Sequence, residues 1–269
     1  MSETVLITGS AGAIGRHLRY SLRREGRRLV LLDLAEQAPL EPGEDAAILN
    51  ASFADSRAIR AACSGVDAII HLGGLSTDGY SLADYLAVNV EGTRVLLDAA
   101  REQGVARVVY ASSHHAVGFH PNTQGLVVPD ALAARPDSFY GVSKAAAESL
   151  ASLYHDRYGL DVICVRIGSF RAAPTDRRTL WNWLSPNDCT RLFEATLATP
   201  PPGYRVVWGV SANTRRIAAL EGGDAIGYQP LDDAEDYLEG IEGEPEPWDR
   251  IGGRYSEFGV DDSPFKTAT

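Results

Sequence analysis

The chain has 269 residues, which is enough for one large α/β domain or for one domain with a small extension. Hydrophobic residues make up 45% of it and charged residues 23%, as in an ordinary soluble globular protein. The formal net charge of −11 argues against a nucleic acid or an acidic membrane as partner. An anionic small substrate would need a local cationic group.

Nothing at the start of the sequence resembles a signal peptide, and no apolar run approaches the ~20 residues that span a bilayer. The cysteines, Cys63, Cys164 and Cys189, have no metal-ligand spacing, and two of them fall in apolar runs typical of buried thiols. We therefore expect a cytoplasmic protein without a metal site.

A glycine-rich turn follows the first apolar run, at residues 5–7, and a helical pattern follows the turn. This is the context of a dinucleotide-binding fingerprint, although such a turn can also be purely structural. Gly9 permits the tight turn, Gly12 lets the backbone approach a pyrophosphate, and Gly15 lets helix and strand pack closely. The predicted cofactor contacts here are Gly9, Gly12, Ala13, Ile14 and Gly15.

The second predicted strand, residues 28–33, ends in a carboxylate, Asp33. An Asp about 20 residues past the fingerprint can bond the adenosine ribose hydroxyls. Leu34 and Ala35 follow it, so no Arg is present to accept a 2′-phosphate, and NAD is favoured over NADP. The alternative is a solvated charge at a strand end.

Two more strand ends supply cofactor candidates. After a third strand at 46–49, Asn50 and Ser52 are candidates for contact with adenine. A fourth strand at 67–71 ends in His71, which we interpret as a packed histidine rather than a catalyst. The residues that follow it suit close backbone approach and are predicted cofactor contacts: Leu72, Gly73 and Gly74.

Strands and helices go on alternating, which predicts an α/β fold, a Rossmann-type doubly wound parallel sheet flanked by helices. Further strands are expected at 107–112, 161–167 and 204–210, and helices at 55–63, 81–103, 137–158, 179–184 and 188–198. Ligands of such a sheet bind at the carboxyl ends of its strands. We expect a cofactor-binding core over residues 1–170 and a small C-terminal substrate-binding extension over 171–269, without a core of its own.

Three residues form a candidate catalytic group. Tyr140 and Lys144 share one face of a predicted helix, and a lysine ammonium beside a tyrosine favours the phenolate. Such a tyrosine can remove a proton from a substrate hydroxyl, which Ser113, at the end of a neighbouring strand, could orient.

With these residues the sequence resembles the extended short-chain dehydrogenases/reductases over residues 4 to about 220. The resemblance implies that Ser113, Tyr140 and Lys144 are the catalytic triad. It also implies that Asn89, Tyr140 and Lys144 contact the cofactor, with Lys144 bound to the nicotinamide ribose. It implies that Asn89 supports the site; read alone, Asn89 is either a buried polar tie to a loop or an exposed residue of no consequence. The motifs that carry the resemblance are Gly9, Gly12 and Gly15 after Thr8, then Asp33, Asn89, Ser113, Tyr140 and Lys144.

A narrower resemblance is to the uronate dehydrogenases within this family, carried by residues 111–119, 135–144, 166–169, 183–185 and 210–214. It implies oxidation of glucuronate or galacturonate at the anomeric carbon, to the aldaric acid lactone, with NAD as cofactor. The substrate contacts it implies are Ser76, Ser113, His114, His115, Tyr140, Ser169 and Arg178. Two positions depart from the pattern, since His114 replaces an Asn and Ser52 replaces an Asp.

Arg178 also makes chemical sense by itself, because a guanidinium binds a carboxylate through two hydrogen bonds. The alternative interpretation is that Arg178 is a solvated arginine at the start of a helix. Arg166, inside a strand, is more simply the partner of a buried carboxylate.

Two other functions remain open. A nucleotide-sugar epimerase or dehydratase uses the same triad but usually carries a larger C-terminal domain than the hundred or so residues present here. A non-catalytic NAD-sensing protein is a second alternative, though such proteins commonly lose the Tyr or the Lys. The fold also suits a homo-oligomer formed through helix faces.

Overall fold

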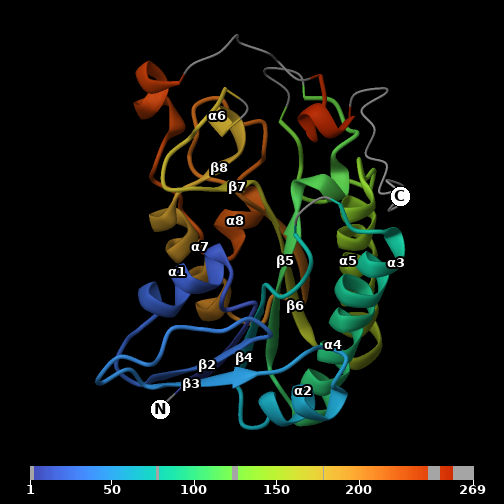
Figure 1. Ribbon diagram of the computed structural model, residues 1–269. Helices are drawn as coiled ribbons and strands as arrows, with labels where there is room; N and C mark the ends of the chain where they lie inside the picture. Colours follow the sequence, from blue (N-terminus) through green and yellow to red (C-terminus); the bar gives the residue numbers. More distant parts are fainter. Residues whose placement is uncertain (1–2, 77–78, 123–126, 178, 242–248, 257–269) are drawn as a thin grey trace, which may run out of the picture.

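The computed structural model describes residues 3–76, 79–122, 127–177, 179–241 and 249–256 (Figure 1). Within them, parallel strands form a seven-stranded sheet in the order β3-β2-β1-β4-β5-β6-β9. The strands are β1 (Glu3–Thr8), β2 (Arg27–Asp33), β3 (Ala46–Asn50), β4 (Ala68–His71), β5 (Arg107–Ser113), β6 (Asp161–Ile167) and β9 (Tyr204–Gly209). The strand order reverses at β1, which confirms the predicted doubly wound sheet and places the ligand crevice at the carboxyl ends of β1 and β4.

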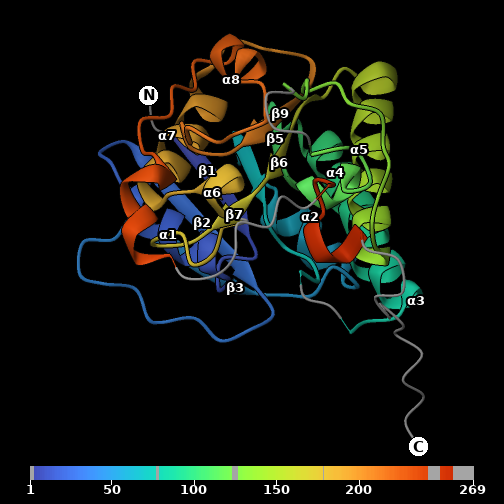
Figure 2. The ribbon, with the colours of Figure 1, turned by 90° about the horizontal axis from the view of Figure 1, so that it is seen from above.

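Helices cover both faces of this sheet, as Figures 1 and 2 show. On one face lie α1 (Ala13–Ser21) and α7 (Pro186–Ala198), and on the other lie α2 (Ser56–Ala62), α4 (Gly92–Gln103) and α5 (Phe139–Tyr158). Because both faces are covered, the strands are buried on both sides. This is why they read in the sequence as short continuous apolar runs.

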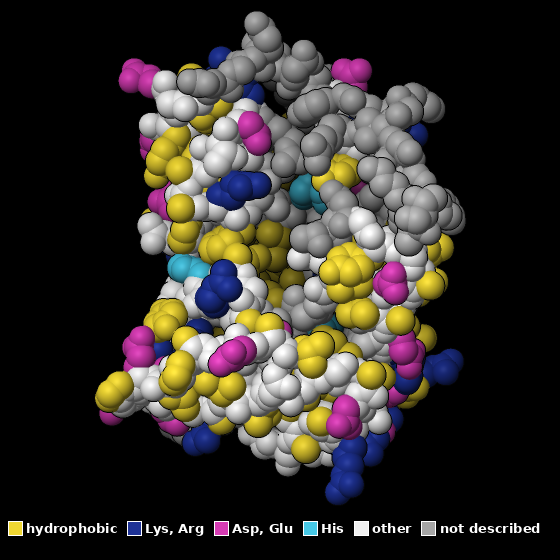
Figure 3. All heavy atoms as spheres, in the orientation of Figure 1, with side chains coloured by type: hydrophobic (Ala, Val, Ile, Leu, Met, Phe, Trp, Pro, Cys, Tyr) yellow, Lys and Arg dark blue, Asp and Glu magenta, His cyan; other side chains and the backbone are white. Residues whose placement is uncertain are grey.

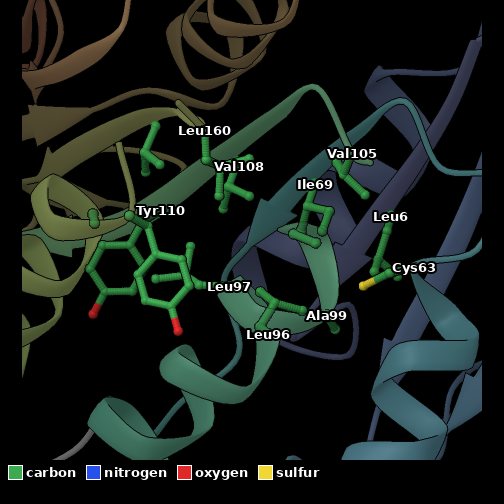
Figure 4. Close-up of a cluster of buried hydrophobic side chains, with 14 of the residues drawn as sticks. Leu6, Cys63, Ile69, Leu96, Leu97, Ala99, Val105, Val108, Tyr110 and Leu160 are labelled. Atoms are coloured by element: carbon green, nitrogen blue, oxygen red, sulfur yellow. The ribbon is translucent and has the colours of Figure 1, made fainter. Parts of the chain in front are cut away.

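Each face of the sheet has its own cluster of buried side chains. Figure 4 shows the cluster on the side of α4, where Leu96 and Leu97 lie beside Ile69 and Val108 of the sheet. All four side chains are buried. Cys63 belongs to the same cluster, and burial raises the pKa of its thiol to about 12, so the thiol stays protonated at neutral pH.

The helix predicted over 81–103 is interrupted by a π-helical turn. It begins as α3 (Leu82–Tyr85), passes through Leu86–Glu91 in the π conformation, and continues as α4. Such turns often occur at functional sites because they change the direction in which side chains point. Here the turn carries Asn89.

The helix predicted over 179–184 is wrong at its end. The helix α6 covers only Thr179–Asn182, and Trp183–Leu184 form the short strand β8, paired with β7 (Ser169–Phe170). The carbonyl oxygen of Trp183 accepts hydrogen bonds from the backbone of Ser211 (2.8 Å) and the side chain of Asn213 (2.9 Å). These bonds to a distant segment replace those that a helix would supply.

The segments after β6 pack against the segment that follows β5. Val117 and Val128 join Trp208, Ile217 and Ile251 in one buried cluster. The remaining helices of this region are α8 (Glu221–Ala225) and 3₁₀ turns at His114–Val117, Ala234–Gly240 and Gly253–Ser256. None of the described helices combines the length and the apolar character needed to cross a membrane.

Candidate active site

The glycine-rich turn after β1 lies against the residues that follow β4. Gly9 has a φ of +70°, and a Cβ there would lie 2.7 Å from the backbone nitrogen of Gly73. A Cβ on Gly15 would lie 2.3 Å from the carbonyl oxygen of Gly9. Gly12 is the N-cap of α1, so the first amide groups of that helix face the turn. These close approaches are the ones that a dinucleotide fingerprint requires.

A cleft of about 820 Å³ opens beside this turn. Figure 3 shows that the molecule is hollowed on one face, with hydrophobic side chains at the bottom of the hollow. The predicted cofactor contacts that line the cleft are Gly9, Gly12, Asp33, Ser52, Leu72, Gly73 and Gly74. A second hollow, of about 830 Å³, lies between α5 and β9, and none of the predicted site residues is among its described lining. We therefore regard the cleft beside the turn as the candidate cofactor site.

Asp33 lies at the end of β2 and connects two parts of the cleft. One carboxylate oxygen accepts a hydrogen bond from the backbone of Ala11 in the glycine-rich turn (2.9 Å), and the other accepts one from Ala35 (2.9 Å). Among the described residues that line the cleft, none is Lys or Arg. A 2′-phosphate would therefore meet a carboxylate and no cation, which favours NAD over NADP.

Seven predicted cofactor contacts do not line the cleft: Asn89, Tyr140 and Lys144, which are described below, and four that lie beside it. Ala13, Ile14 and Gly15 form the first turn of α1. Asn50 ends β3, is exposed, and donates a hydrogen bond from its side chain to the carbonyl of Leu34 (2.8 Å). Their contact with a cofactor stays a prediction.

Asn89 is buried and its side chain is hydrogen-bonded to the loop after β4, which is the first of its two interpretations. Its side-chain oxygen accepts from the backbone of Leu75 (2.7 Å), and its amide nitrogen donates to the Leu75 carbonyl (3.0 Å) and to the hydroxyl of Ser143 (2.9 Å). The π-helical turn thus fixes the loop after β4 to α5. A Cβ on Gly74 would lie 2.8 Å from the same side-chain oxygen, so the loop approaches Asn89 closely.

His71 is packed below the site. Its ring nitrogens lie 2.7 Å from the hydroxyl of Thr8 and 3.1 Å from that of Thr93. Burial, with a smaller contribution from the charge of Lys144, lowers its pKa to about 3. A histidine that stays neutral over the working pH range and bonds two threonines is a structural residue.

The catalytic candidates lie where the end of β5 meets the start of α5. Ser113 is the last residue of β5, and Tyr140 lies in the first turn of α5. A Cβ on Gly141 would lie 2.3 Å from the carbonyl oxygen of His115, so only glycine lets the helix start this close to the strand end. The ammonium nitrogen of Lys144 lies 5.6 Å from the centroid of the Tyr140 ring.

Lys144 is buried, and its ammonium group donates a hydrogen bond to the carbonyl of Ala111 (2.7 Å). Burial lowers its pKa to about 8, while the charge of Glu148 opposes this shift. A buried cation beside a phenol favours the phenolate form of that phenol. The pair is suited to general-base chemistry on an alcohol.

A buried ion pair, Arg166–Glu148, lies one helical turn from Lys144. Arg166 of β6 donates to both carboxylate oxygens of Glu148 on α5 (2.9 and 2.8 Å), as expected for a partner of a buried carboxylate. Ser112 donates to the same carboxylate (2.6 Å). Glu148 lies one turn after Lys144, so the network joins β5, β6 and α5 directly beneath the catalytic candidates.

The structure brings most of the predicted substrate contacts to this end of the sheet. Ser76 lines the cleft, and Ser169 begins β7 just after β6. A ring nitrogen of the buried His114 lies 3.1 Å from the carbonyl oxygen of Ile167. The His115 ring lies 4.0 Å from the ring of His114 and 5.9 Å from that of Tyr140. Arg178 lies outside the described residues.

Sequence comparison agrees with this geometry. The chain matches the NAD dependent epimerase/dehydratase family over residues 5–181. The protein belongs to this family. The predicted cofactor class is therefore confirmed, together with the resemblance to the extended short-chain dehydrogenases/reductases.

Uronate dehydrogenases are among the most similar members of the family. That of Pseudomonas syringae pv. tomato is 39% identical over 91% of this chain and 88% of its own length. A mutant uronate dehydrogenase from Agrobacterium tumefaciens complexed with NAD superposes with a TM-score of 0.88 at 35% identity, covering 95% of this chain and 97% of the other. A glucuronic acid dehydrogenase from Chromohalobacter salexigens gives 0.89 at 34% identity, covering 98% and 100%.

Sequence reasoning missed two residues beside the catalytic candidates of this family member. Asp137 lies 2.7 Å from the ring of His115, and it was considered only as the start of a helix. The ring of Tyr255, to which the sequence assigns no role, lies 5.1 Å from that of His115. Neither contact could be inferred from spacing, because an aspartate before a helix and a lone aromatic residue occur in many folds.

Proposed function

We propose that this protein is an NAD-dependent uronate dehydrogenase, which oxidises glucuronate or galacturonate at the anomeric carbon to the aldaric acid lactone. The observation that carries the proposal is that Ser113, at the end of β5, lies beside the start of α5, which carries Tyr140 and Lys144. Asn89 bonds both Ser143 of this helix and Leu75, which lines the cofactor cleft. Similarity to uronate dehydrogenases over nearly the whole chain supports the choice of substrate.

The residues of the cleft fit NAD. A Cβ at Gly9 would fill the space in which the turn meets Gly73, and Gly12 leaves the start of α1 open to a pyrophosphate. Asp33 offers carboxylate oxygens to ribose hydroxyls, while Lys144 would bond the nicotinamide ribose. When bound, NAD supplies the acceptor for the hydride that leaves the anomeric carbon.

The protein's own residues would handle the proton. Ser113 holds the anomeric hydroxyl, and the Tyr140 phenolate removes its proton as the carbonyl of the lactone forms. The buried charge of Lys144 keeps the phenolate available.

The rest of the site would bind the sugar acid. Ser76, His114, His115 and Ser169 supply polar groups around the pyranose, and Arg178 supplies the cation for its carboxylate. In this proposal residues 171–269 act as the substrate-binding extension of the core at 1–170. We also expect a homo-oligomer in the cytoplasm.

The test is formation of NADH from NAD with glucuronate, galacturonate and glucose. We expect turnover of the uronates but not of glucose. Tyr140→Phe should lower kcat by roughly 10²- to 10⁴-fold, the usual contribution of a general base, while NADH still binds. Tyr158→Phe is the matched control, because it removes a hydroxyl from an exposed tyrosine at the end of the same helix. Normal turnover by Tyr140→Phe would exclude the assigned base.

A nucleotide-sugar epimerase or dehydratase is the second candidate, because the family contains such enzymes and the triad is the same. An epimerase restores its cofactor in each cycle and gives no net NADH. Binding of NADH without any turnover would instead point to a non-catalytic NAD-sensing protein.

A further inference from the structure

A buried carboxylate outside the predicted site holds one of the predicted substrate contacts. The side chain of Asp137 is fully buried, and its Oδ2 lies 2.7 Å from Nδ1 of His115. Its Oδ1 accepts a hydrogen bond from the hydroxyl of Ser138 (2.9 Å). Ser138 is the N-cap of α5, so this carboxylate is fixed to the start of the helix that carries Tyr140.

Two glycines from distant parts of the chain make room for this carboxylate. A Cβ on Gly118 would lie 1.9 Å from Oδ2 of Asp137, and a Cβ on Gly252 would lie 1.8 Å from the same atom. The two glycines are also joined, since the backbone of Gly252 donates to the carbonyl of Gly118 (2.9 Å). The backbone around Asp137 therefore admits a carboxylate only because neither neighbour has a side chain.

The contact with Asp137 determines which nitrogen of His115 carries the proton. An ionised carboxylate can only accept, so Nδ1 is the donor, and Nε2 of the neutral ring is then an acceptor. Among the described residues, none forms a hydrogen bond with Nε2. The His115 side chain is 15% exposed, and its ring packs edge-on against Tyr255 (5.1 Å) and Tyr140 (5.9 Å).

We propose that Asp137 is a positioning residue, which holds His115 as the Nδ1-protonated tautomer so that Nε2 accepts a hydrogen bond from a hydroxyl of the sugar. The role in substrate binding rests on the proposed function, in which His115 touches the substrate beside Tyr140. The tautomer itself depends only on contacts within the protein.

The first test therefore needs no substrate. Imidazole ¹⁵N NMR of the apoprotein distinguishes the two tautomers, and His115→Gln assigns the signal of His115 among the six histidines. We expect the Nδ1-protonated form in the wild-type protein and its loss in Asp137→Asn, whose amide can also donate to Nδ1. An Nε2-protonated His115 in the wild-type protein would overturn the proposal, even if the variant failed to fold.

The second test is a double-mutant cycle with glucuronate. Asp137→Asn should lower kcat/KM by roughly 10- to 100-fold, mainly through KM, because a hydrogen bond from the substrate is lost. In the His115→Gln background the same change should have less than about a twofold effect. An equal loss in both backgrounds would mean that Asp137 is merely structural. If the wild-type protein does not oxidise uronates, the proposed function fails, while the NMR test still decides the tautomer.

Discussion

Lys144→Met separates the effect of this buried lysine on stability from its proposed role in turnover. Lys144 is only 5% exposed, and burial lowers its pKa from 10.5 to about 8. At pH 7 the lysine is charged in both the folded and the unfolded states, so the folded state carries the full penalty of burying that charge. The difference between the two pKa values corresponds to about 3 kcal/mol of unfolding free energy, at about 1.36 kcal/mol per tenfold change.

Methionine has a similar volume and no charge, but it leaves the carbonyl of Ala111 without the donor it has now. That loss costs about 1 kcal/mol, so we expect the variant to gain about 2 kcal/mol while losing turnover. Lysine is rare in this chain, with Lys144 and Lys266 as the only two, so Lys266→Met is a control for the chemical change.

The assay is urea unfolding of the apoprotein at several pH values. Between about pH 8 and 10.5 the unfolded state binds the proton that folded Lys144 has released, so wild-type stability rises with pH. The advantage of Lys144→Met should therefore be largest at pH 7 and shrink across that window. A variant less stable than the wild type at pH 7, or a difference independent of pH, would refute the reasoning.

Two further predictions concern the cofactor turn and the histidine beneath it. Gly15→Ala places a Cβ 2.3 Å from the carbonyl oxygen of Gly9, so we expect it to lower Tm by several degrees and to abolish NADH binding. In Gly12→Ala the Cβ would lie 3.2 Å from the same oxygen, so this variant should mainly weaken NADH binding. Equal losses of Tm in the two variants would contradict this expectation. Burial lowers the pKa of His71 from 6.5 to about 3, so between these pH values the unfolded state binds a proton that the folded state does not. From this group, the free energy of unfolding decreases by about 1.36 kcal/mol for each unit by which the pH is lowered across that range. His71→Gln should lessen this fall in acid unfolding curves, and parallel curves for the two proteins would exclude it.

The sheet could be predicted because its signals are local. A strand buried on both faces reads as a continuous apolar run, and such runs located β1, β2, β4, β5 and β6 to within a residue or two. The catalytic candidates could also be predicted from the sequence, because the spacing of Tyr140 and Lys144 places them on one helix face. Asp33 was found because its distance from the glycine-rich turn is characteristic of a ribose contact.

The features that escaped prediction depend on contacts between distant segments. Trp183 leaves the helix because its carbonyl bonds residues 28 and 30 positions later, which periodicity cannot detect. Gly118 and Gly252 are needed only because Asp137 lies between them, although they are far apart along the chain. A glycine that serves a remote carboxylate has the same local sequence signal as a glycine in any loop.

The polar groups of the site divide into those that would meet ligand and those that keep the geometry. The Arg166–Glu148 pair, with Ser112, joins β5, β6 and α5 beneath Lys144, and removing either charge would leave the other buried and unpaired. The Asp137 carboxylate holds the ring of His115, which packs against that of Tyr140. These contacts join groups of the protein to one another, so they hold the geometry of the site without drawing on the binding energy of a substrate. We therefore infer that the burial of so many charged groups in one place, although unfavourable for folding, maintains the geometry of the candidate catalytic residues.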